Sequence, residues 1–326
     1  MSQRNNRAMW ISGITVSYLL ATVAALAADP ATVTMPLPLP KQISTSNFIH
    51  ATSLPWQTVC EWSDVDGKYR NSRTDGLDRP SEATVPKGAM CAAFRRFAFP
   101  NGRSFSEAHV QKAHPTPVQV DRSTNFVYIA SGHGYHMVDG KTMDSEPGDA
   151  FVQAVGKSHQ TTALSDDYIQ IGIPLPKVDD GDGLKTSEAD LARGNLIHHK
   201  DAPKSDVCFI GYKDGAVKVV VRTPANAASI PADVSCFTVY SLLARPGGAM
   251  VEVFARKGSK SLPHHEELDT IIYYVKGRVQ ADIDGEVQEM KAGDAVLHPG
   301  GVLHADEFLA DTIQLEIKYP KTTKSP

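Results

Sequence analysis

The residues with the clearest capacity for chemistry lie in one short segment, residues 264–270, which reads H-H-E-E-L-D-T. Because side chains alternate along an extended strand, we expect His264, Glu266 and Thr270 on one face and His265 on the other. Imidazole and carboxylate groups are ligands of iron, manganese and zinc, so the segment predicts a divalent metal site. The alternative is structural: a histidine at a strand end can bond the backbone, and acidic neighbours can be solvated.

An internal repeat organises the elements that must position these residues. The pattern V-C-x5-D-G occurs at residues 59–67 and again at 207–215, an offset of 148. Residues 132–159 then align with residues 277–304 at an offset of 145 without a gap, and most identities are glycine or aspartate. A match that keeps its register this long and concentrates on turn residues indicates a duplicated structural unit.

The repeated unit has the pattern of β-structure. Residues 249–255 and 313–318 alternate in polarity, as half-buried strands do, and Asp284-Gly285 is a hairpin signal. Many short strands separated by glycine and proline turns are typical of sandwiches and jelly rolls. We therefore predict an all-β chain with two barrels in tandem, the first with its linker at residues 56–200 and the second at residues 201–326.

The end of the second repeat resembles a known family. Gly293, Pro299, Gly301 and His304 follow the spacing G-x5-P-x-G-x2-H, which is the second motif of the cupins. The asparagine that follows in the family is replaced by Phe308. The resemblance implies two cupin jelly-roll β-barrels, an arrangement called a bicupin.

The first cupin motif, H-x-H-x3-E-x6-G, is visibly altered. Counted back from Gly277, the family's first histidine falls on His264, its second histidine on Glu266 and its glutamate on Thr270. The resemblance therefore implies a two-histidine, one-carboxylate set of His264, Glu266 and His304, which leaves positions open for a substrate or oxygen. A one-residue difference in spacing would make His265 the ligand instead.

The first repeat keeps less of this pattern. Its second motif retains Gly148, Gly156 and His159, and the positions of the first motif hold Gln119, Asp121 and Asn125. One histidine and one aspartate are a poor set of metal ligands. We therefore predict a degenerate first barrel without metal and one divalent ion, Fe, Mn or Zn, in the second. His298, beside the second motif, could line the mouth of the barrel, but a surface position is expected.

The repeat also predicts how the four cysteines pair. Cys60 and Cys208 begin equivalent V-C-x5-D-G segments, and Cys91 matches Cys236 at the later offset. Duplication should copy a local bond, so we predict the disulfides Cys60–Cys91 and Cys208–Cys236, with paired Cα atoms about 4.4–6.8 Å apart. Four buried thiols are the alternative.

The amino terminus indicates export. Arg4 and Arg7 precede an apolar run from Ala8 to Ala27 that ends in the small residues A-L-A. This is the pattern of a secretory signal peptide, residues 1–27, cleaved after Ala27, and an uncleaved membrane anchor is the alternative. After cleavage no stable membrane anchor is expected, and the protein would be periplasmic or secreted. Residues 28–55, rich in proline, are expected to form an extended arm that packs on a barrel or another subunit or is disordered, so a homo-oligomer is one expectation.

The net charge of the whole chain bears on which classes of partner the protein binds. A formal net charge of -4 and the lack of a basic block argue against nucleic acid. We expect a small-molecule ligand, and a metal-dependent, oxygenase-like enzyme acting on a small polar or aromatic molecule. A non-oxidative isomerase, lyase or decarboxylase, or a bicupin that only binds its ligand, are the alternatives.

Overall fold

The structure is a computed structural model. It describes residues 44–66, 69–76, 85–87, 89–112, 115–116, 118–120, 123–175, 196–213, 216–245 and 248–320. The predicted signal peptide, the arm up to residue 43 and Asp121 lie outside the described residues. Within the described part, no helix is long and apolar enough to cross a membrane.

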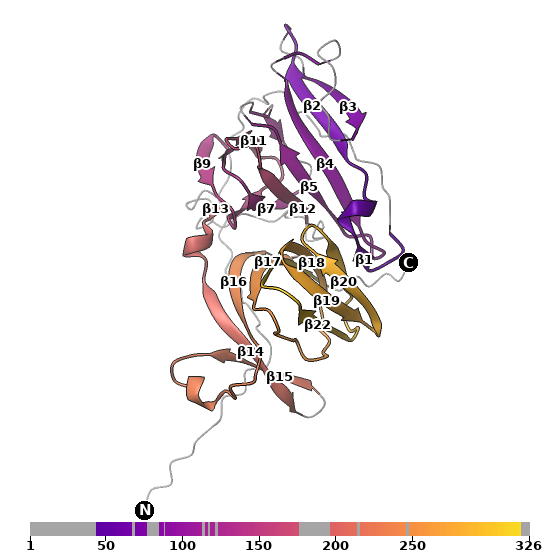
Figure 1. The fold of residues 1–326 in the computed structure, drawn as a ribbon. Helices are drawn as coiled ribbons and strands as arrows, with labels where there is room; N and C mark the ends of the chain where they lie inside the picture. The colour runs from indigo at the N-terminus through magenta and orange to yellow at the C-terminus, as the bar shows by residue number, and fades with distance from the viewer. Residues whose placement is uncertain are drawn as a thin grey trace, which may run out of the picture. The chain divides into compact units, whose positions relative to one another are not determined.

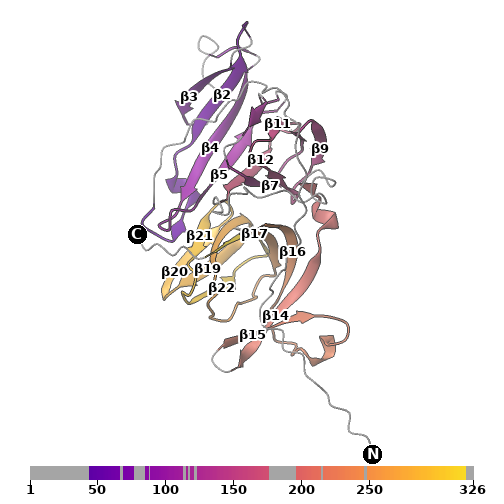
Figure 2. The same cartoon turned by 180° about the vertical axis from the view of Figure 1, so that it is seen from behind.

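The described elements are strands, joined by three short 3-10 turns, as the predicted all-β class requires. The turns are η1 (Ala51–Ser53), η2 (His199–Asp201) and η3 (Ala227–Ser229). Figures 1 and 2 show the first repeat in indigo to magenta and the second in orange to yellow.

The first repeat forms two antiparallel sheets. The eight-stranded sheet has, in spatial order, β13 (Leu196–Ile197), β10 (Ala150–Gln153), β7 (Asn125–Ser131), β12 (Ile169–Pro174), β5 (Ser104–Val110), β4 (Met90–Ala98), β2 (Gln57–Ser63) and β3 (Tyr69–Asp75). The four-stranded sheet has β6 (Gln119–Val120), β11 (Ser158–Ala163), β8 (Gly134–Val138) and β9 (Lys141–Ser145). Two facing sheets of this kind are the jelly-roll arrangement.

The second repeat has the same organisation. Its eight-stranded sheet runs β1 (Phe48–Ile49), β21 (Ala295–His298), β18 (Asp269–Lys276), β23 (Thr312–Tyr319), β17 (Gly248–Ala255), β16 (Cys236–Arg245), β14 (Lys204–Lys213) and β15 (Ala216–Arg222). The smaller sheet has β20 (Glu286–Lys291), β19 (Arg278–Ile283) and β22 (His304–Phe308). The chain is therefore built from two tandem jelly-roll barrels.

Turn chemistry fixes the register of both repeats. Asp139 and Asp284 have φ of 51° and 53°, and each is followed by a glycine with positive φ. Two consecutive residues with positive φ form the type I′ turn that matches the twist of a hairpin, here β8–β9 and β19–β20. The predicted hairpin at Asp284-Gly285 is therefore present, and the repeat supplies its counterpart.

The two repeats exchange their first strands. β1 precedes the first barrel in sequence, yet Phe48 pairs with Val296 in the second barrel. β13 opens the second repeat, yet Leu196 pairs with Phe151 in the first barrel. Each barrel is thus completed by a strand from the other repeat.

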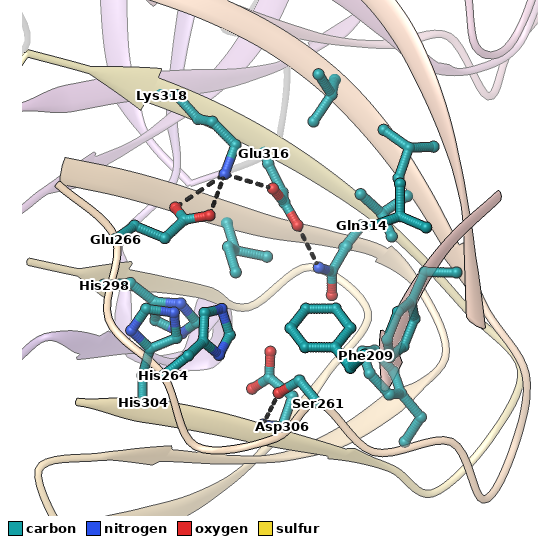
Figure 3. A pocket seen from close by; sticks show the side chains of 17 residues that line it. Phe209, Ser261, His264, Glu266, His298, His304, Asp306, Gln314, Glu316 and Lys318 are labelled. Atoms are coloured by element: carbon teal, nitrogen blue, oxygen red, sulfur yellow. Dashed lines mark hydrogen bonds and ion pairs between the residues drawn. The ribbon is translucent and has the colours of Figure 1, made fainter. Parts of the chain in front are cut away.

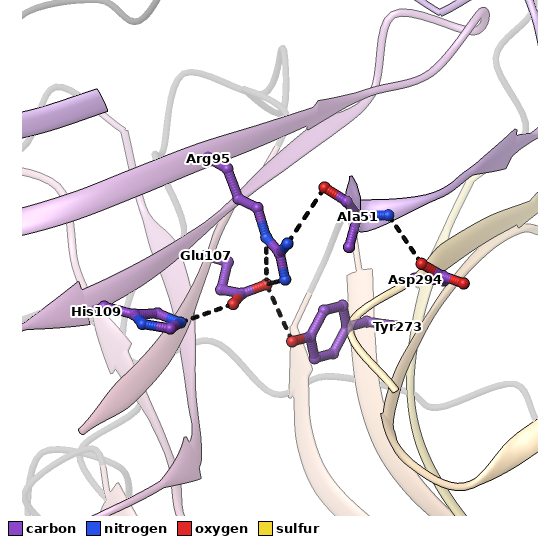
Figure 4. A network of polar contacts seen from close by, with 6 residues as sticks. All are labelled: Ala51, Arg95, Glu107, His109, Tyr273 and Asp294. Carbon is purple, nitrogen blue, oxygen red and sulfur yellow. Dashed lines mark hydrogen bonds and ion pairs between the residues drawn. The ribbon is translucent and has the colours of Figure 1, made fainter. Parts of the chain in front are cut away.

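The interface between the barrels contains both polar and apolar contacts, and its polar contacts come from equivalent positions of the two repeats. Tyr128 donates to Glu252 at 2.6 Å, and Tyr273, which lies 145 residues after Tyr128, donates to Glu107 at 3.1 Å. Figure 4 shows Glu107 between Arg95, His109 and Tyr273. One buried apolar cluster includes residues of both repeats around these contacts.

Both predicted disulfides are present, and no described cysteine is free. Cys60 faces Cys91 across the β2–β4 pair, and Cys208 faces Cys236 across the β14–β16 pair. The Cα atoms are 4.0 Å apart in each bond, below the expected range. The bonded cysteines are directly opposite each other in antiparallel pairs, where Cα atoms approach to about 4.5 Å, at the short end of the expected range.

Candidate metal centre

The second barrel contains a cavity of about 220 Å³ between its two sheets (Figure 3). One side is apolar and the other carries the histidines and charged groups. The lining residues are Val207, Phe209, Phe237, Val239, Val251, Val253, Ser261, His264, Glu266, Ile272, His298, His304, Asp306, Phe308, Gln314, Glu316 and Lys318. The sequence-predicted residues His264, Glu266 and His304 therefore share one cavity.

Three histidines meet at the polar end of the cavity. His264 and His304 bond each other's backbone in an isolated bridge, at N–O distances of 3.0 and 2.8 Å, and their ring centroids are 4.4 Å apart. The ring of His298 lies 4.1 Å from that of His304. The expectation of a surface position for His298 is wrong: the residue is 3% exposed, because the last position of β21 points between the sheets.

Backbone carbonyls orient two of the three rings. Nδ1 of His264 lies 2.7 Å from the Leu262 carbonyl, and Nδ1 of His304 lies 3.1 Å from the Val302 carbonyl. A carbonyl oxygen only accepts, so Nδ1 must carry the proton in each ring. Each neutral ring then has its lone pair on Nε2, the arrangement in which second hydrogen bonds orient metal-binding histidines.

Burial keeps the imidazoles of His298 and His304 neutral. Desolvation, followed by the neighbouring His264, lowers the pKa of His304 to about 4. Desolvation and then His304 hold the pKa of His298 well below its usual value. The Nε2 atom of His298 is buried and has no hydrogen-bond partner. A neutral, unpartnered imidazole nitrogen is a good ligand for a divalent cation and a costly group to leave unsatisfied.

Glu266 is bound by protein groups. Lys318 donates to its two oxygens at 2.8 and 2.9 Å, and the Thr270 hydroxyl donates at 2.7 Å. Burial alone would raise the pKa of Glu266, but the charge and hydrogen bonds of Lys318 together with the hydrogen bond from Thr270 outweigh it, and the pKa falls below its ordinary value. Burial alone would lower the pKa of Lys318, which Glu316 and Glu266 raise instead. The carboxylate is thus ionised and held at the cavity wall.

The remaining predicted ligand lies elsewhere. His265 is exposed and does not line the cavity. The strand predicted through this segment begins only at Asp269; residues 265–268 lie outside it, and residues 267–268 form a bend. The expected alternation of faces nevertheless holds for His264 and Glu266, which line the cavity.

The donors are close, but they do not surround one point. Among the described residues, no group of three or more histidine, cysteine, aspartate or glutamate side chains is arranged so that it could hold a metal ion. The chemistry of the set still fits one: two rings present Nε2, and the third has a buried nitrogen without a partner.

The first barrel lacks two of the three histidines found in the cavity of the second. His159 pairs with Gln119, as His304 pairs with His264. Gln153 pairs with Asn125, as His298 pairs with Thr270. The three histidine positions are therefore Gln119, Gln153 and His159 in the first barrel, and Gln119 donates to Glu61 at 2.7 Å.

Sequence reasoning missed His298 and the polar residues of β23. Gln314, Glu316 and Lys318 occupy alternate positions of that strand and all line the cavity. The alternation I-Q-L-E-I-K was visible in the sequence. The alternation alone does not show that its polar face points into the barrel. That follows from the position of β23 between β18 and β17 in the sheet, which the sequence does not reveal.

Comparisons with known proteins find a family match within the second barrel. The cupin domain family matches residues 250–312. AerE from Microcystis aeruginosa is 12% identical, with a TM-score of 0.49 over 70% of this chain and 92% of that one. Oxalate decarboxylase from Bacillus subtilis is 13% identical, with a TM-score of 0.46 over 72% of this chain and 74% of that one.

Salicylate 1,2-dioxygenase from Pseudoaminobacter salicylatoxidans, in adducts with gentisate, is 11% identical, with a TM-score of 0.45 over 71% of this chain and 68% of that one. A comparison with curated protein sequences finds no match. The family match falls on the repeat that carries both cupin motifs, within a chain of two jelly-roll barrels. Residues 250–312, which lie in the second barrel, therefore carry a cupin domain.

Proposed function

We propose that the protein is a metal-dependent enzyme that acts on a small molecule in the cavity of the second barrel. His264, His298 and His304 would hold one divalent ion, Fe, Mn or Zn. The observation that carries the proposal is the buried Nε2 of His298, which has no partner and lies beside two histidines whose Nε2 atoms are also left free. A buried nitrogen of this kind costs about 1–3 kcal/mol unless something binds it.

His298 replaces Glu266 as third ligand in this proposal. Glu266 was placed among the ligands because of its position in the first motif, but its two oxygens already accept three hydrogen bonds. Thr270 occupies the position of the family's glutamate, and its cross-strand neighbour is His298. An imidazole from the adjacent strand would thus supply the ligand that Thr270 cannot.

The side chains of the cavity have separable roles. The Leu262 and Val302 carbonyls fix the rings of His264 and His304. Lys318 holds the Glu266 carboxylate at the cavity wall. The apolar residues of β14, β16 and β17 exclude water and lower the local dielectric, so charged groups at the polar end interact more strongly. A bound ion would supply Lewis acidity and, as iron or manganese, redox chemistry toward oxygen.

Oxygenation is the first candidate reaction, because three imidazoles leave coordination positions open. A non-oxidative reaction is the second candidate. It is favoured by the Lys318–Glu266 pair and Asp306, which place proton-carrying groups in the same cavity. Oxygen uptake during turnover of a substrate separates the two reactions.

The proposed ion can be tested by thermal unfolding of chelator-treated protein with Fe(II), Mn(II) or Zn(II) added without oxygen. An ion at 100 times its Kd should add about 2.7 kcal/mol of stability and raise the Tm. His304→Ala should abolish the rise, and His265→Ala should leave it unchanged. If none of the three ions stabilises the wild-type protein, the proposal is wrong.

We also propose that the protein is exported and begins at Ala28 after cleavage. Two disulfides support an oxidising compartment, since cytosolic thiols are kept reduced. Amino-terminal sequencing of protein from a periplasmic or culture fraction should begin A-D-P. An intact Met1 in that fraction would contradict cleavage.

A further inference from the structure

We propose that the cavity of the second barrel takes a single-ring, hydrogen-bond-donating molecule, with hydroxyl or amino groups on an apolar body, in preference to a carboxylate. The inference rests on the proposed function of this cavity and names its ligand class. It follows from which polar atoms of the wall lack partners and from what the remaining wall is made of.

Two acceptor oxygens of the wall are buried without a partner. They are Oδ1 of Asp306 and Oε1 of Gln314, on residues that are 7% and 3% exposed. The Gln314 amide nitrogen donates to Glu316 at 2.8 Å, and a carboxylate only accepts, so the unpartnered atom of Gln314 is the oxygen. Both atoms need a donor, which a hydroxyl or amino group of a ligand would supply.

The cationic side chain of the cavity wall, Lys318, is already paired with protein carboxylates. An ammonium group has three donors, and Lys318 directs them at the two oxygens of Glu266 and, at 3.2 Å, at Glu316. Lys318 is the single lysine or arginine among the cavity-lining residues, all of which the structure describes. A ligand carboxylate would therefore add acceptor oxygens beside those of Asp306, Glu266 and Glu316, and no side chain of the wall has a free cationic donor to pair with them.

The opposite wall suits a flat ring. Phe209 packs edge-on against Phe237 and against His264, at centroid distances of 5.4 and 5.1 Å, and Phe308 lies 5.4 Å from Phe237. These rings form a continuous aromatic surface that leads to the histidines. The volume of about 220 Å³ also fits one ring with its substituents, because a cavity of about 150 Å³ binds benzene.

The test uses two probes with opposite chemistry, resorcinol and benzoate, titrated by calorimetry into metal-loaded and into chelator-treated protein. The preference is read from the chelator-treated protein, in which no metal ion can pair with benzoate. Resorcinol has two donors that cannot chelate one ion, whereas benzoate has acceptors and a negative charge. Resorcinol should bind more tightly than benzoate. Asp306→Leu should weaken resorcinol binding about tenfold, because it removes the unpartnered Oδ1 acceptor at similar side-chain size.

Gln314→Met is the second variant, since it removes the unpartnered oxygen at similar side-chain length, and it should weaken resorcinol about fivefold. Gln170→Met is the matched control, because Gln170 occupies the equivalent position of β12 in the first barrel and its Oε1 is also buried without a partner. It should leave both affinities unchanged. A resorcinol affinity that is no higher than that of benzoate, or no resorcinol binding, would overturn the inference.

Metal analysis of the same samples separates the two proposals. If the metal is retained and resorcinol does not bind, the ligand class is wrong and the metal site stands. If resorcinol binds as expected to protein that retains no metal, the ligand class stands and the proposed function fails.

Discussion

The two barrels share a scaffold and differ in nearly every group that could do chemistry. The scaffold positions kept in both are the disulfides, the Asp-Gly hairpins and the exchanged strands. In the site, His264 and His298 of the second barrel correspond to Gln119 and Gln153 of the first. A duplicated fold can thus keep the turns and bonds that specify its register while one copy lacks the donor set.

The central strand shows the same contrast. Lys318 pairs with Thr270 in the second barrel, and at the equivalent place Pro174 pairs with Asn125 in the first. Lys318 holds the Glu266 carboxylate, whereas proline has no charged group to offer. The first barrel therefore lacks the ion pair as well as two of the three histidines.

The interface glutamates lie at equivalent positions of the two repeats, and their replacement gives the largest expected effect. Glu107 bonds Arg95 at 2.6 and 2.9 Å, whereas Glu252 has the imidazole of His199 instead. Glu107→Gln leaves a mostly buried guanidinium without its charge partner, so we expect a loss of about 3–5 kcal/mol in the free energy of unfolding.

The matched variant Glu252→Gln replaces the carboxylate that binds Tyr128 and His199 by an amide, which leaves one acceptor oxygen and strands no arginine. We therefore expect a smaller loss of about 1–3 kcal/mol in the free energy of unfolding. Urea unfolding of the two variants measures the difference. Equal losses would show that Arg95 does not distinguish the two halves of the interface.

The disulfides should have nearly equal effects, because both barrels retain them. The bonds close 31 and 28 residues, and loop entropy gives on the order of 3–4 kcal/mol for each. Cys60→Ser with Cys91→Ser should therefore cost about as much as Cys208→Ser with Cys236→Ser. Denaturant midpoints decide, and a loss confined to one pair would mean that the bonds are not equivalent.

Acid should weaken the first barrel through His136. Desolvation, followed by His159, lowers the pKa of His136 to about 3, whereas the unfolded residue titrates near pH 6.5. The unfolded state therefore binds the extra proton as pH falls from about 6.5 toward 3, and stability should fall by up to about 1.4 kcal/mol per pH unit.

His136→Gln should make this decline shallower while leaving the stability slope above pH 7 unchanged. Urea unfolding between pH 4 and 8 measures both slopes. An unchanged slope below pH 6.5 in the variant would show that His136 is protonated in the folded protein.

Local patterns predicted the scaffold well. The hairpins follow from Asp-Gly pairs, and the disulfides follow from two cysteines that recur at equivalent places. These features depend on neighbours in sequence or on the repeat itself. The strand alternation also placed His264 and Glu266 in one cavity, although the segment is bent between them and β18.

The parts of the site that escaped prediction depend on contacts between distant strands. His298 is buried because β21 pairs with β18 and its ring packs on His304. The Lys318–Glu266 pair joins residues 52 positions apart. Local sequence periodicity indicates neither contact. The partner of Glu266 therefore could not be predicted from residues 264–270 alone.

The most direct test of the account is the metal content of purified mature protein after reconstitution, compared with His298→Gln and His159→Gln. Both variants place glutamine at equivalent depth, and the first copies Gln153 of the other barrel. We predict about one equivalent of a single divalent metal in the wild type and in His159→Gln, and a strong loss in His298→Gln. Equal metal in all three proteins, or loss only in His159→Gln, would contradict the assignment of the site to the second barrel.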